Sequence, residues 1–294
     1  MELKVNNTQG CDNSHRKPQR CYHVALSIAG SDSSGGAGIQ ADIKTFSALG
    51  VYGATAITAI TAQNTVGVHS QLALPARMVY DQIMAVVEDI NPSVIKLGML
   101  SNVEIATTVA EALAQCNVPI ILDPVMVSSS GHRLLSIEAQ EVVKRRLLPM
   151  ATLVTPNIPE MEALTSMPLA TAEQKHAAAQ YLLSLGAHAI LLKGGHEEGD
   201  MKTDILYIRT SSGIEVSYFT SPTIQTKNIH GTGCTLSSAI AAYMARGCTL
   251  TEAVGRAKEY VSEAIQMGAD VSIGSGFGPV NHLYNPQKML TYEE

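Results

Sequence analysis

Short apolar runs alternate with longer segments of helical length along most of this chain, and this alternation limits the possible folds more than any other feature. Several of the runs are apolar throughout rather than at every second position, which is typical of strands buried on both faces of a parallel sheet. We expect strands at six ranges: His23–Ala29, Tyr52–Ile60, Val94–Leu97, Pro119–Leu122, Thr152–Thr155 and Ala187–Leu192.

Segments long enough for helices separate these runs: Ala37–Leu49, Ala76–Ile90, Val103–Gln115, Ser136–Leu148 and Ala172–Leu185. The repeated strand–helix order predicts an α/β fold in which helices cover both faces of a mostly parallel sheet. The later part differs, because Asp204–Thr210 and Ile214–Thr220 flank a short loop that contains Gly213. Two such strands predict a late β-hairpin. Two further helices are expected at Thr235–Met244 and Leu250–Met267.

The composition excludes several classes of protein. Apolar residues make up 46% of the chain and charged residues 16%, which is unlike a disordered chain. The 20 basic and 26 acidic residues give a net charge of −6, so we expect no nucleic-acid partner. No apolar run has the length of a membrane span, so we expect no membrane partner either.

Residues 1–21 are polar and lack the apolar stretch of a secretory signal, so we interpret them as a loosely ordered leader. Neither a linker nor an internal repeat divides the remainder, which predicts a single domain over residues 22–294. The 5 cysteines are scattered without metal-ligand spacing, and this pattern favours the reducing cytoplasm.

A glycine-rich loop, Gly30–Gly38, follows the first predicted strand, where ligands bind in open α/β sheets. Gly36–Ala41 matches the G-x-G-x-x-[G/A] pattern of dinucleotide-binding proteins. That pattern needs an acidic residue after the next strand, where this chain has Thr61–Asn64, so we reject a dinucleotide site. The loop is either a tight turn or, as we favour, a place where the backbone approaches a ligand.

A second glycine-rich segment, Asn228–Cys234, opens a predicted helix. Gly231 and Gly233 allow successive N–H groups to point one way, and the helix start adds its positive dipole end, so the segment predicts an anion site. Such a site can hold the charge of a transferring phosphoryl group. We expect this field to lower the pKa of Cys234, whose thiolate could then accept a proton from a substrate hydroxyl. The alternative is a helix cap with an incidental cysteine.

Polar side chains also follow three other predicted strands. Asn157 and Glu160 are spaced to reach one site from a first helical turn, and they offer oxygen ligands for Mg²⁺. Asp123 is a second candidate carboxylate for the metal. Ordinary helix or loop capping is the alternative for all three residues. Lys193 precedes two glycines and could reach nucleotide phosphates, or could be a surface lysine before a turn.

Taken together, these segments resemble the ribokinase-like superfamily, and most closely the bacterial hydroxymethylpyrimidine/phosphomethylpyrimidine kinases of thiamine biosynthesis. The resemblance runs from about Val24 to His282 and is carried by eight motifs: AGSDSSGGAGIQADIKTFSALGVYG, TAITAQNT, KLGML, DPVM, TPNIPE, LLKGGH, HGTGC and GFGPVNH. It implies a three-layer α/β/α fold. It also implies transfer of the ATP γ-phosphoryl group to 4-amino-5-hydroxymethyl-2-methylpyrimidine, and then to the monophosphate to give the pyrophosphate.

The resemblance also implies residue roles. Gln63 and Asp42 would contact the pyrimidine, and Gly30 and Met99 would line its pocket. The catalytic base would be Cys234, in an anion hole made with Gly231, Thr232 and Gly233. Asn157 and Glu160 would belong to the Mg²⁺–ATP motif, and Lys193 and Thr226 would contact the nucleotide. The family is commonly dimeric, which implies a homodimer.

Three positions depart from the family pattern. Ser129 stands where Lys or Thr is common, His132 where Asp is common, and Ile229 where Thr is commoner. The first two could tune a lid over the site. Two alternative functions stay open at this point: a pyridoxal or pyridoxine kinase, whose substrate also carries a hydroxymethyl group, and a non-catalytic sensor of nucleotide or pyrimidine.

Overall fold

The computed structural model describes residues 20–127, 131, 134–195 and 199–293. Nine strands of this part of the chain form one central sheet in the order β10-β9-β8-β7-β6-β5-β2-β3-β4. Their bounds are β2 Val24–Asp32, β3 Tyr52–Gln63, β4 Val68–Ala73, β5 Val94–Leu97, β6 Ile120–Leu122, β7 Leu153–Val154, β8 Ala189–Leu192, β9 Met201–Thr210 and β10 Gly213–Pro222. The six neighbouring strands from β8 to β3 are parallel, while β4, β9 and β10 run antiparallel to their neighbours.

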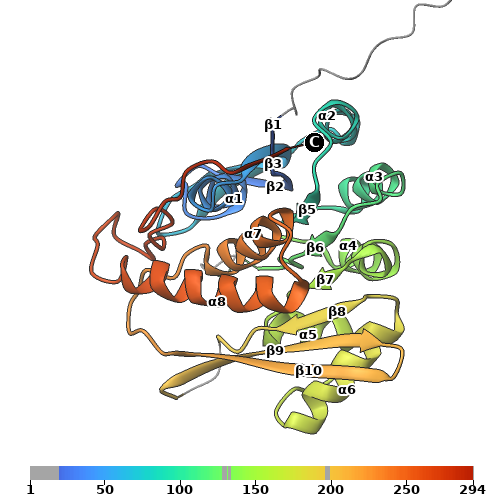
Figure 1. The fold of residues 1–294 in the computed structure, drawn as a ribbon, viewed down its shortest axis with the longest axis vertical. Helices are drawn as coiled ribbons and strands as arrows, with labels where there is room; N and C mark the ends of the chain where they lie inside the picture. Colours follow the sequence, from blue (N-terminus) through green and yellow to red (C-terminus); the bar gives the residue numbers. More distant parts are fainter. Residues whose placement is uncertain (1–19, 128–130, 132–133, 196–198, 294) are drawn as a thin grey trace, which may run out of the picture.

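Helices cover both faces of this sheet, as Figure 1 shows. One face carries α1 (Gly38–Ala48), α7 (Thr232–Ala245) and α8 (Leu250–Gln266), which share a hydrophobic core that includes Phe46, Ile240 and Val254. The other face carries α2 (Ala76–Asp89), α3 (Val103–Leu113), α4 (Ile137–Val142), α5 (Ile158–Thr165) and α6 (Ala172–Ser184). Their core is aliphatic and includes Ile83 and Leu182. The expected three-layer α/β/α architecture and late β-hairpin are confirmed.

The helix expected at Ser136–Leu148 differs from the structure. Ser136 caps α4, but the chain then widens into a π-helical turn at Val143–Leu147 and tightens into a 3₁₀ turn at Leu148–Met150. Pro149 accounts for the end of the helix, because it has no N–H to donate to the preceding turn. Strand β4 was not predicted, since half of its positions are exposed and its sequence has no continuous apolar run.

A two-stranded sheet outside the central one joins residues near the two ends of the chain. It consists of β1 (Arg20–Tyr22) paired with β11 (Thr291–Glu293), and a guanidinium N–H of Arg20 donates to Thr291 Oγ1 at 2.9 Å. Arg20 and Cys21, which we assigned to the leader, therefore belong to a strand. Residues 1–19 lie outside the described residues, and a single domain over residues 22–294 stays a prediction.

The loops that follow β2, β6, β7 and β8 all open at the carboxyl edge of the parallel strands. Ligands of open α/β sheets bind at this edge, so the functional site is expected there. None of the helices in the described residues is long and apolar enough to cross a membrane.

Candidate active site

Two glycine loops meet backbone to backbone at this edge. The carbonyl oxygen of Gly36 lies so close to Gly231 that a Cβ atom on Gly231 would overlap it, and Gly231 also has φ +79°. Gly38 has φ +56° and begins α1, while Thr232 begins α7. The two helix starts therefore converge, and a helix start suits an anion. The N–H of Thr232 already donates to the Ile229 carbonyl at 3.2 Å. The predicted anion hole at Gly231, Thr232, Gly233 and Cys234 occupies this position, and its role stays a prediction.

Asp32 stabilises the contact between the two glycine loops by hydrogen bonding to both. Its carboxylate accepts hydrogen bonds from the backbone N–H groups of Ser34 (2.9 Å), Gly36 (3.1 Å) and Ala37 (2.8 Å), and from the ring of His230 (2.8 Å). Burial alone would raise the pKa of Asp32, but the hydrogen bonds from His230, Ser34 and Ala37 outweigh it and lower this pKa to about 2. We assigned no role to Asp32 or His230 from the sequence, although Asp before Ser-Ser-Gly is typical of a side-chain-stabilised turn.

Cys234 lies in the first turn of α7, and the backbone N–H of Gly38 at the start of α1 is one of the groups that lower the pKa of its thiol. The prediction that its pKa is lowered is wrong: burial raises the pKa of the thiol to about 11, and the ammonium of Lys96 only partly offsets this. Cys234 is partly buried, and partial removal of a thiolate from water opposes ionisation more than the helix start and the cation favour it. Cys234 is therefore a neutral thiol at pH 7.

Asp42 lies one turn of α1 below Gly38, and no part of it is exposed. Its oxygens accept from Lys96 Nζ (2.9 Å to each), from Ser27 Oγ and from Ser238 Oγ (2.6 Å). This position does not support the predicted contact with a pyrimidine, because protein groups enclose the carboxylate. We assigned no role to Lys96 from the sequence, although a lysine inside the apolar strand Val94–Leu97 is itself an informative signal.

Lys193 connects two carboxylates beside the glycine loop. Its Nζ lies 2.9 Å from Asp123 Oδ1, 3.6 Å from Glu160 Oε2 and 3.4 Å from the position of a Cβ on Gly233. Burial would raise the pKa of Asp123, but the ammonium groups of Lys193 and Lys96 outweigh it and lower this pKa. Glu160 differs, because burial raises its pKa more than Lys193 lowers it, and the Asp123 charge adds to the rise.

Asn157 and Glu160 form a reciprocal cap at the start of α5. Asn157 Oδ1 accepts from the Glu160 N–H, and Glu160 Oε2 accepts from the Asn157 N–H, both at 2.8 Å. The capping alternative is thus confirmed, and the same cap aims Glu160 at Lys193. A single Mg²⁺ needs only one or two protein carboxylates when phosphates supply the other ligands, and Asp123 with Glu160 fits that need. Their roles as metal ligands stay predictions.

The residues predicted to line the pyrimidine pocket are divided between two neighbouring strands. A Cβ atom on Gly30 would lie 2.6 Å from the end of the Met99 side chain, so these two residues are in contact. Gln63 ends β3, and its amide nitrogen lies 3.4 Å from Nε2 of His230. The structure therefore places Gln63 beside the glycine loops, and its substrate contact stays a prediction.

Thr226 is bound to backbone groups rather than to the cluster around Lys193. Its hydroxyl donates to the carbonyl of Ala269 at 2.8 Å and accepts from the Asn228 N–H at 3.0 Å. Its predicted contact with the nucleotide has no support from this position. Ile229 is 44% exposed beside the anion loop, whereas the departures at Ser129 and His132 lie outside the described residues.

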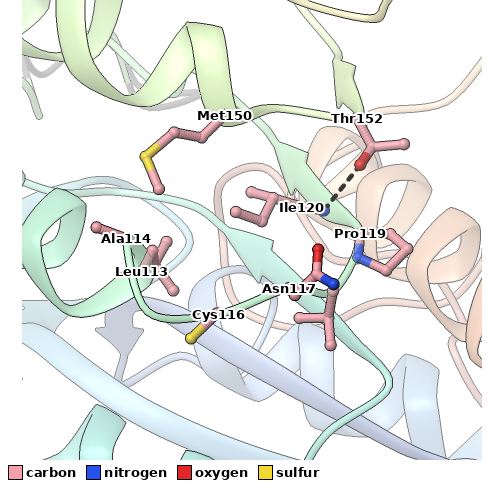
Figure 2. Close-up of a pocket in the computed structure, with 9 residues that line it drawn as sticks. Leu113, Ala114, Cys116, Asn117, Pro119, Ile120, Met150 and Thr152 are labelled. Atoms are coloured by element: carbon pink, nitrogen blue, oxygen red, sulfur yellow. Dashed lines mark hydrogen bonds between the residues drawn. The ribbon is translucent and has the colours of Figure 1, made fainter.

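A cavity of about 450 Å³ lies at the opposite edge of the sheet (Figure 2). Its walls include Cys116, Met150 and Thr152, and the Thr152 hydroxyl accepts from the Ile120 N–H at 3.2 Å. These residues precede or begin β6 and β7, so the cavity is at the amino ends of the strands. Within the described ranges, no cluster of three or more His, Cys, Asp or Glu side chains could hold a metal on its own.

Comparison with known proteins gives one family. The family model described as phosphomethylpyrimidine kinase matches residues 32–281. A curated hydroxymethylpyrimidine/phosphomethylpyrimidine kinase of Rhizobium meliloti is 47% identical over 262 residues, which cover 89% of this chain and 97% of that protein. A bifunctional thiamine biosynthesis protein of Geobacter sulfurreducens is 47% identical, and the match covers 88% of this chain and 52% of that longer protein.

Solved structures agree with the sequence matches. The phosphomethylpyrimidine kinase of Clostridium difficile superposes with a TM-score of 0.72 at 45% identity, covering 82% of this chain and 99% of that one. A pyridoxal kinase of Staphylococcus aureus, in complex with AMP-PCP and pyridoxal, superposes with a TM-score of 0.80 at 34% identity. The match covers 92% of this chain and 98% of that one. Both are similar to this chain in fold and in sequence.

Proposed function

The chain belongs to the phosphomethylpyrimidine kinase family, and from this membership we infer its reaction. It is an ATP-dependent kinase of thiamine biosynthesis, which phosphorylates 4-amino-5-hydroxymethyl-2-methylpyrimidine and then its monophosphate to the pyrophosphate. The observation that carries this function is the convergence of the two helix starts on Cys234, beside the Lys193–Asp123 pair. A transferring phosphoryl group needs positioning and positive charge, and this edge of the sheet offers both.

In the proposed reaction, the hydroxymethyl oxygen of the pyrimidine attacks the γ-phosphorus of ATP. A new oxygen–phosphorus bond forms, and the bond to the β,γ-bridging oxygen breaks, so ADP leaves. The hydroxyl proton passes to the Cys234 thiolate, whose own proton has been lost to solvent. The N–H groups of Gly231, Thr232 and Gly233 hold the charge on the equatorial oxygens.

Gln63 is the proposed contact for the pyrimidine ring, since a side-chain amide can both donate to a ring nitrogen and accept from an amino group. Gly30 and Met99 form the proposed wall of its pocket. Asn157, Lys193 and Thr226 are the proposed nucleotide contacts. The contact between Gly30 and Met99 supports the pocket wall, and the position of Lys193 beside Gly233 supports its nucleotide contact. Thr226 is proposed from the family membership alone.

Mg²⁺ is the proposed metal, held by Asp123 and Glu160 together with the phosphates of ATP. When bound, it neutralises phosphate charge during the transfer. Lys193, which these carboxylates already attract, provides the second cation of the site.

We further propose that the protein is a homodimer in the cytoplasm. Ile60 and Leu72 face each other across β3 and β4 and are 47% and 66% exposed. These exposed apolar side chains support a contact between subunits at the outer strand β4. The scattered cysteines support a reducing compartment. Sedimentation analysis of wild type and of Leu72→Lys tests the dimer, which the lysine is expected to dissociate.

The direct test of the reaction compares wild type with Cys234→Ala and Cys116→Ala. Formation of ADP and of the phosphorylated pyrimidine is followed with the hydroxymethylpyrimidine as acceptor. We expect Cys234→Ala to lose most turnover and Cys116→Ala, which lies at the distant cavity, to keep it. Near-normal turnover by Cys234→Ala would remove the base assignment, and no ADP with any hydroxymethyl acceptor would favour a non-catalytic sensor.

A pyridoxal kinase activity is the second candidate, because a pyridoxal kinase structure superposes on this chain with a TM-score of 0.80. The same assay with pyridoxal as acceptor separates the two functions. We expect the pyrimidine to have the higher kcat/KM. A higher kcat/KM for pyridoxal would reverse this assignment.

A further inference from the structure

The buried ion pair of Lys96 and Asp42 lies directly below the site, and the proposed reaction does not use it. Lys96 belongs to β5 and Asp42 to α1, and neither has any exposed surface. Lys96 Nζ lies 2.9 Å from each carboxylate oxygen. Burial opposes the charge on Lys96, but the Asp42 carboxylate outweighs it and keeps the pKa of Lys96 above its ordinary value. Lys96 is therefore a charged ammonium at neutral pH.

Stability alone gives little reason for this pair. Replacing a buried ion pair with apolar residues of similar size is often neutral or stabilising, and the neighbours Val94, Ile95 and Leu97 of Lys96 are all apolar. A buried ion pair is better explained when its charges act on a neighbouring functional group. The position of the Lys96–Asp42 pair identifies that group.

Two pairs of residues on α1 and α7 lie one helical turn apart. In the upper pair, at the start of both helices, the Gly38 N–H is one of the groups that lower the pKa of the Cys234 thiol. In the lower one, Ser238 Oγ donates to Asp42 Oδ1 at 2.6 Å. Asp42 is four residues after Gly38, and Ser238 is four residues after Cys234, so each lower residue lies on the same helix face as the upper one. Lys96 and Ser27 complete the lower contact from β5 and β2.

The two charged residues of the lower contact, Lys96 and Asp42, also act electrostatically on the Cys234 thiol. Four charged groups act on Cys234: Lys96 from β5, Asp42 from α1, and Asp123 and Lys193, which follow β6 and β8. Lys96 is the strongest of the groups that favour the thiolate, and the Asp42 carboxylate opposes it. Asp42 thus both holds the cation in place and limits its effect.

We propose that Lys96 and Asp42 are positioning residues for Cys234: their ion pair, tied to α7 through Ser238, fixes the thiol against the start of α1 and supplies the buried cation that faces the thiolate. The proposal rests on the role of Cys234 given above. It makes Lys96 and Asp42 supports of the thiol rather than contacts of the substrate.

The test measures the thiol directly, without turnover. Iodoacetamide alkylation of Cys234 is followed by peptide mass spectrometry over a range of pH, in the full chain, for Lys96→Met and Asp42→Asn. Lys96→Met removes the cation and leaves an anion, so we expect the pH midpoint of alkylation to rise by about one unit. Asp42→Asn leaves the cation unopposed, so we expect the midpoint to fall by about one unit. A structural role alone predicts no opposite shifts, and midpoints that stay together or move in the same direction would overturn the proposal.

A single variant leaves one buried charge unpaired and can fail to fold. The double variant Lys96→Met/Asp42→Asn buries no unpaired charge, and we expect its midpoint to rise above wild type because the Lys96 effect is the larger one. An unchanged midpoint in the double variant would also overturn the proposal. Ile83→Ala, a buried position of α2 on the other face of the sheet, is the control for general loosening and is expected to leave the midpoint unchanged.

The thiol measurement is independent of the reaction. If Cys234→Ala kept its turnover while the midpoints moved in opposite directions, the base assignment would fail and the positioning of the thiol would stand. If Cys234 were the base, Lys96→Met would also lower kcat about tenfold or more with little change in KM for the pyrimidine.

Discussion

Lys193 Nζ lies 2.9 Å from Oδ1 of Asp123, although the two residues follow strands that are two places apart in the sheet. The Lys193 side chain is 12% exposed, and its Nζ also lies 3.6 Å from Glu160 Oε2. Both carboxylates hold Lys193 next to Gly233, where the phosphates are expected. Lys193 is therefore the cation of the site that is available before any ligand arrives.

Replacing Lys193 with methionine keeps the length of the side chain and removes its charge. We expect kcat/KM for ATP to fall about a hundredfold, because a cation is lost where phosphoryl charge develops. Steady-state kinetics with varied ATP measure this. The control is Lys144→Met, since Lys144 makes a pair of the same 2.9 Å length with Glu141 on the surface. Equal kinetics for Lys193→Met and wild type would contradict the nucleotide role of Lys193.

Two glycines that flank α7 allow the effect of the close approach of the loops to be separated from the effect of backbone strain. Gly231→Ala and Gly247→Ala both put a side chain at positive φ, +79° and +86°, which costs about 1–2 kcal/mol each. Only Gly231 also faces the Gly36 carbonyl, whereas a Cβ on Gly247 meets nothing within 4 Å. We expect both variants to lose thermal stability and only Gly231→Ala to lose kcat/KM. Equal activity losses would show that strain, not the loop contact, is responsible.

The lowered pKa of His282 predicts how the free energy of unfolding depends on pH. Its Nε2 lies 3.0 Å from Thr235 Oγ1, and Thr235 in turn donates to the Gly231 carbonyl at 2.8 Å, so His282 supports the anion loop. Burial, assisted by the nearby Lys44 and His230, lowers the pKa of His282 from 6.5 to about 4. The unfolded chain therefore binds a proton more readily than the folded chain between these values. The resulting stability is complete above pH 6.5 and is lost as the pH falls to about 4.

The size of this effect is about 3 kcal/mol, at 1.36 kcal/mol for each pKa unit. Urea unfolding at pH 7 and at pH 4.5 measures it. We expect the free energy of unfolding to fall less between these pH values in His282→Gln than in wild type. His69→Gln, on the exposed face of β4, is the control for removing a histidine. Parallel pH curves for His282→Gln and wild type would exclude His282 as the titrating group.

The sequence was sufficient for the layers of the fold because several of the six parallel strands, such as β6 and β8, are apolar throughout. It failed for β4, where Leu72 is exposed and the pattern has no apolar run. It also failed for the end of the helix after Ser136, where packing allows a π-helical turn before Pro149. Both failures are local, and neither changes the order of the strands around the site.

The positions of the site residues could be predicted where one segment contains all of them, as in the glycines and Cys234 of the loop that opens α7. The positions could not be predicted where residues from distant segments come together. Lys96 and Asp42 are 54 positions apart, and their pairing depends on how α1 packs on β5. The wrong sign for the pKa of Cys234 has the same cause, because the sequence shows the helix start but not the burial that outweighs it.

The raised pKa of Cys234 gives the last prediction. If the thiolate is the base, kcat/KM depends on its fraction in the free enzyme, and with a pKa of about 11 this fraction is small at neutral pH. We expect kcat/KM for the pyrimidine to rise about tenfold for each pH unit between pH 7.5 and 9.5. In Cys234→Asp the carboxylate is already ionised over this range, so the profile should be flat. Activity measured again at pH 7.5 after incubation at pH 9.5 controls for unfolding. A flat wild-type profile, or a rising one in Cys234→Asp, would show that another group accepts the proton.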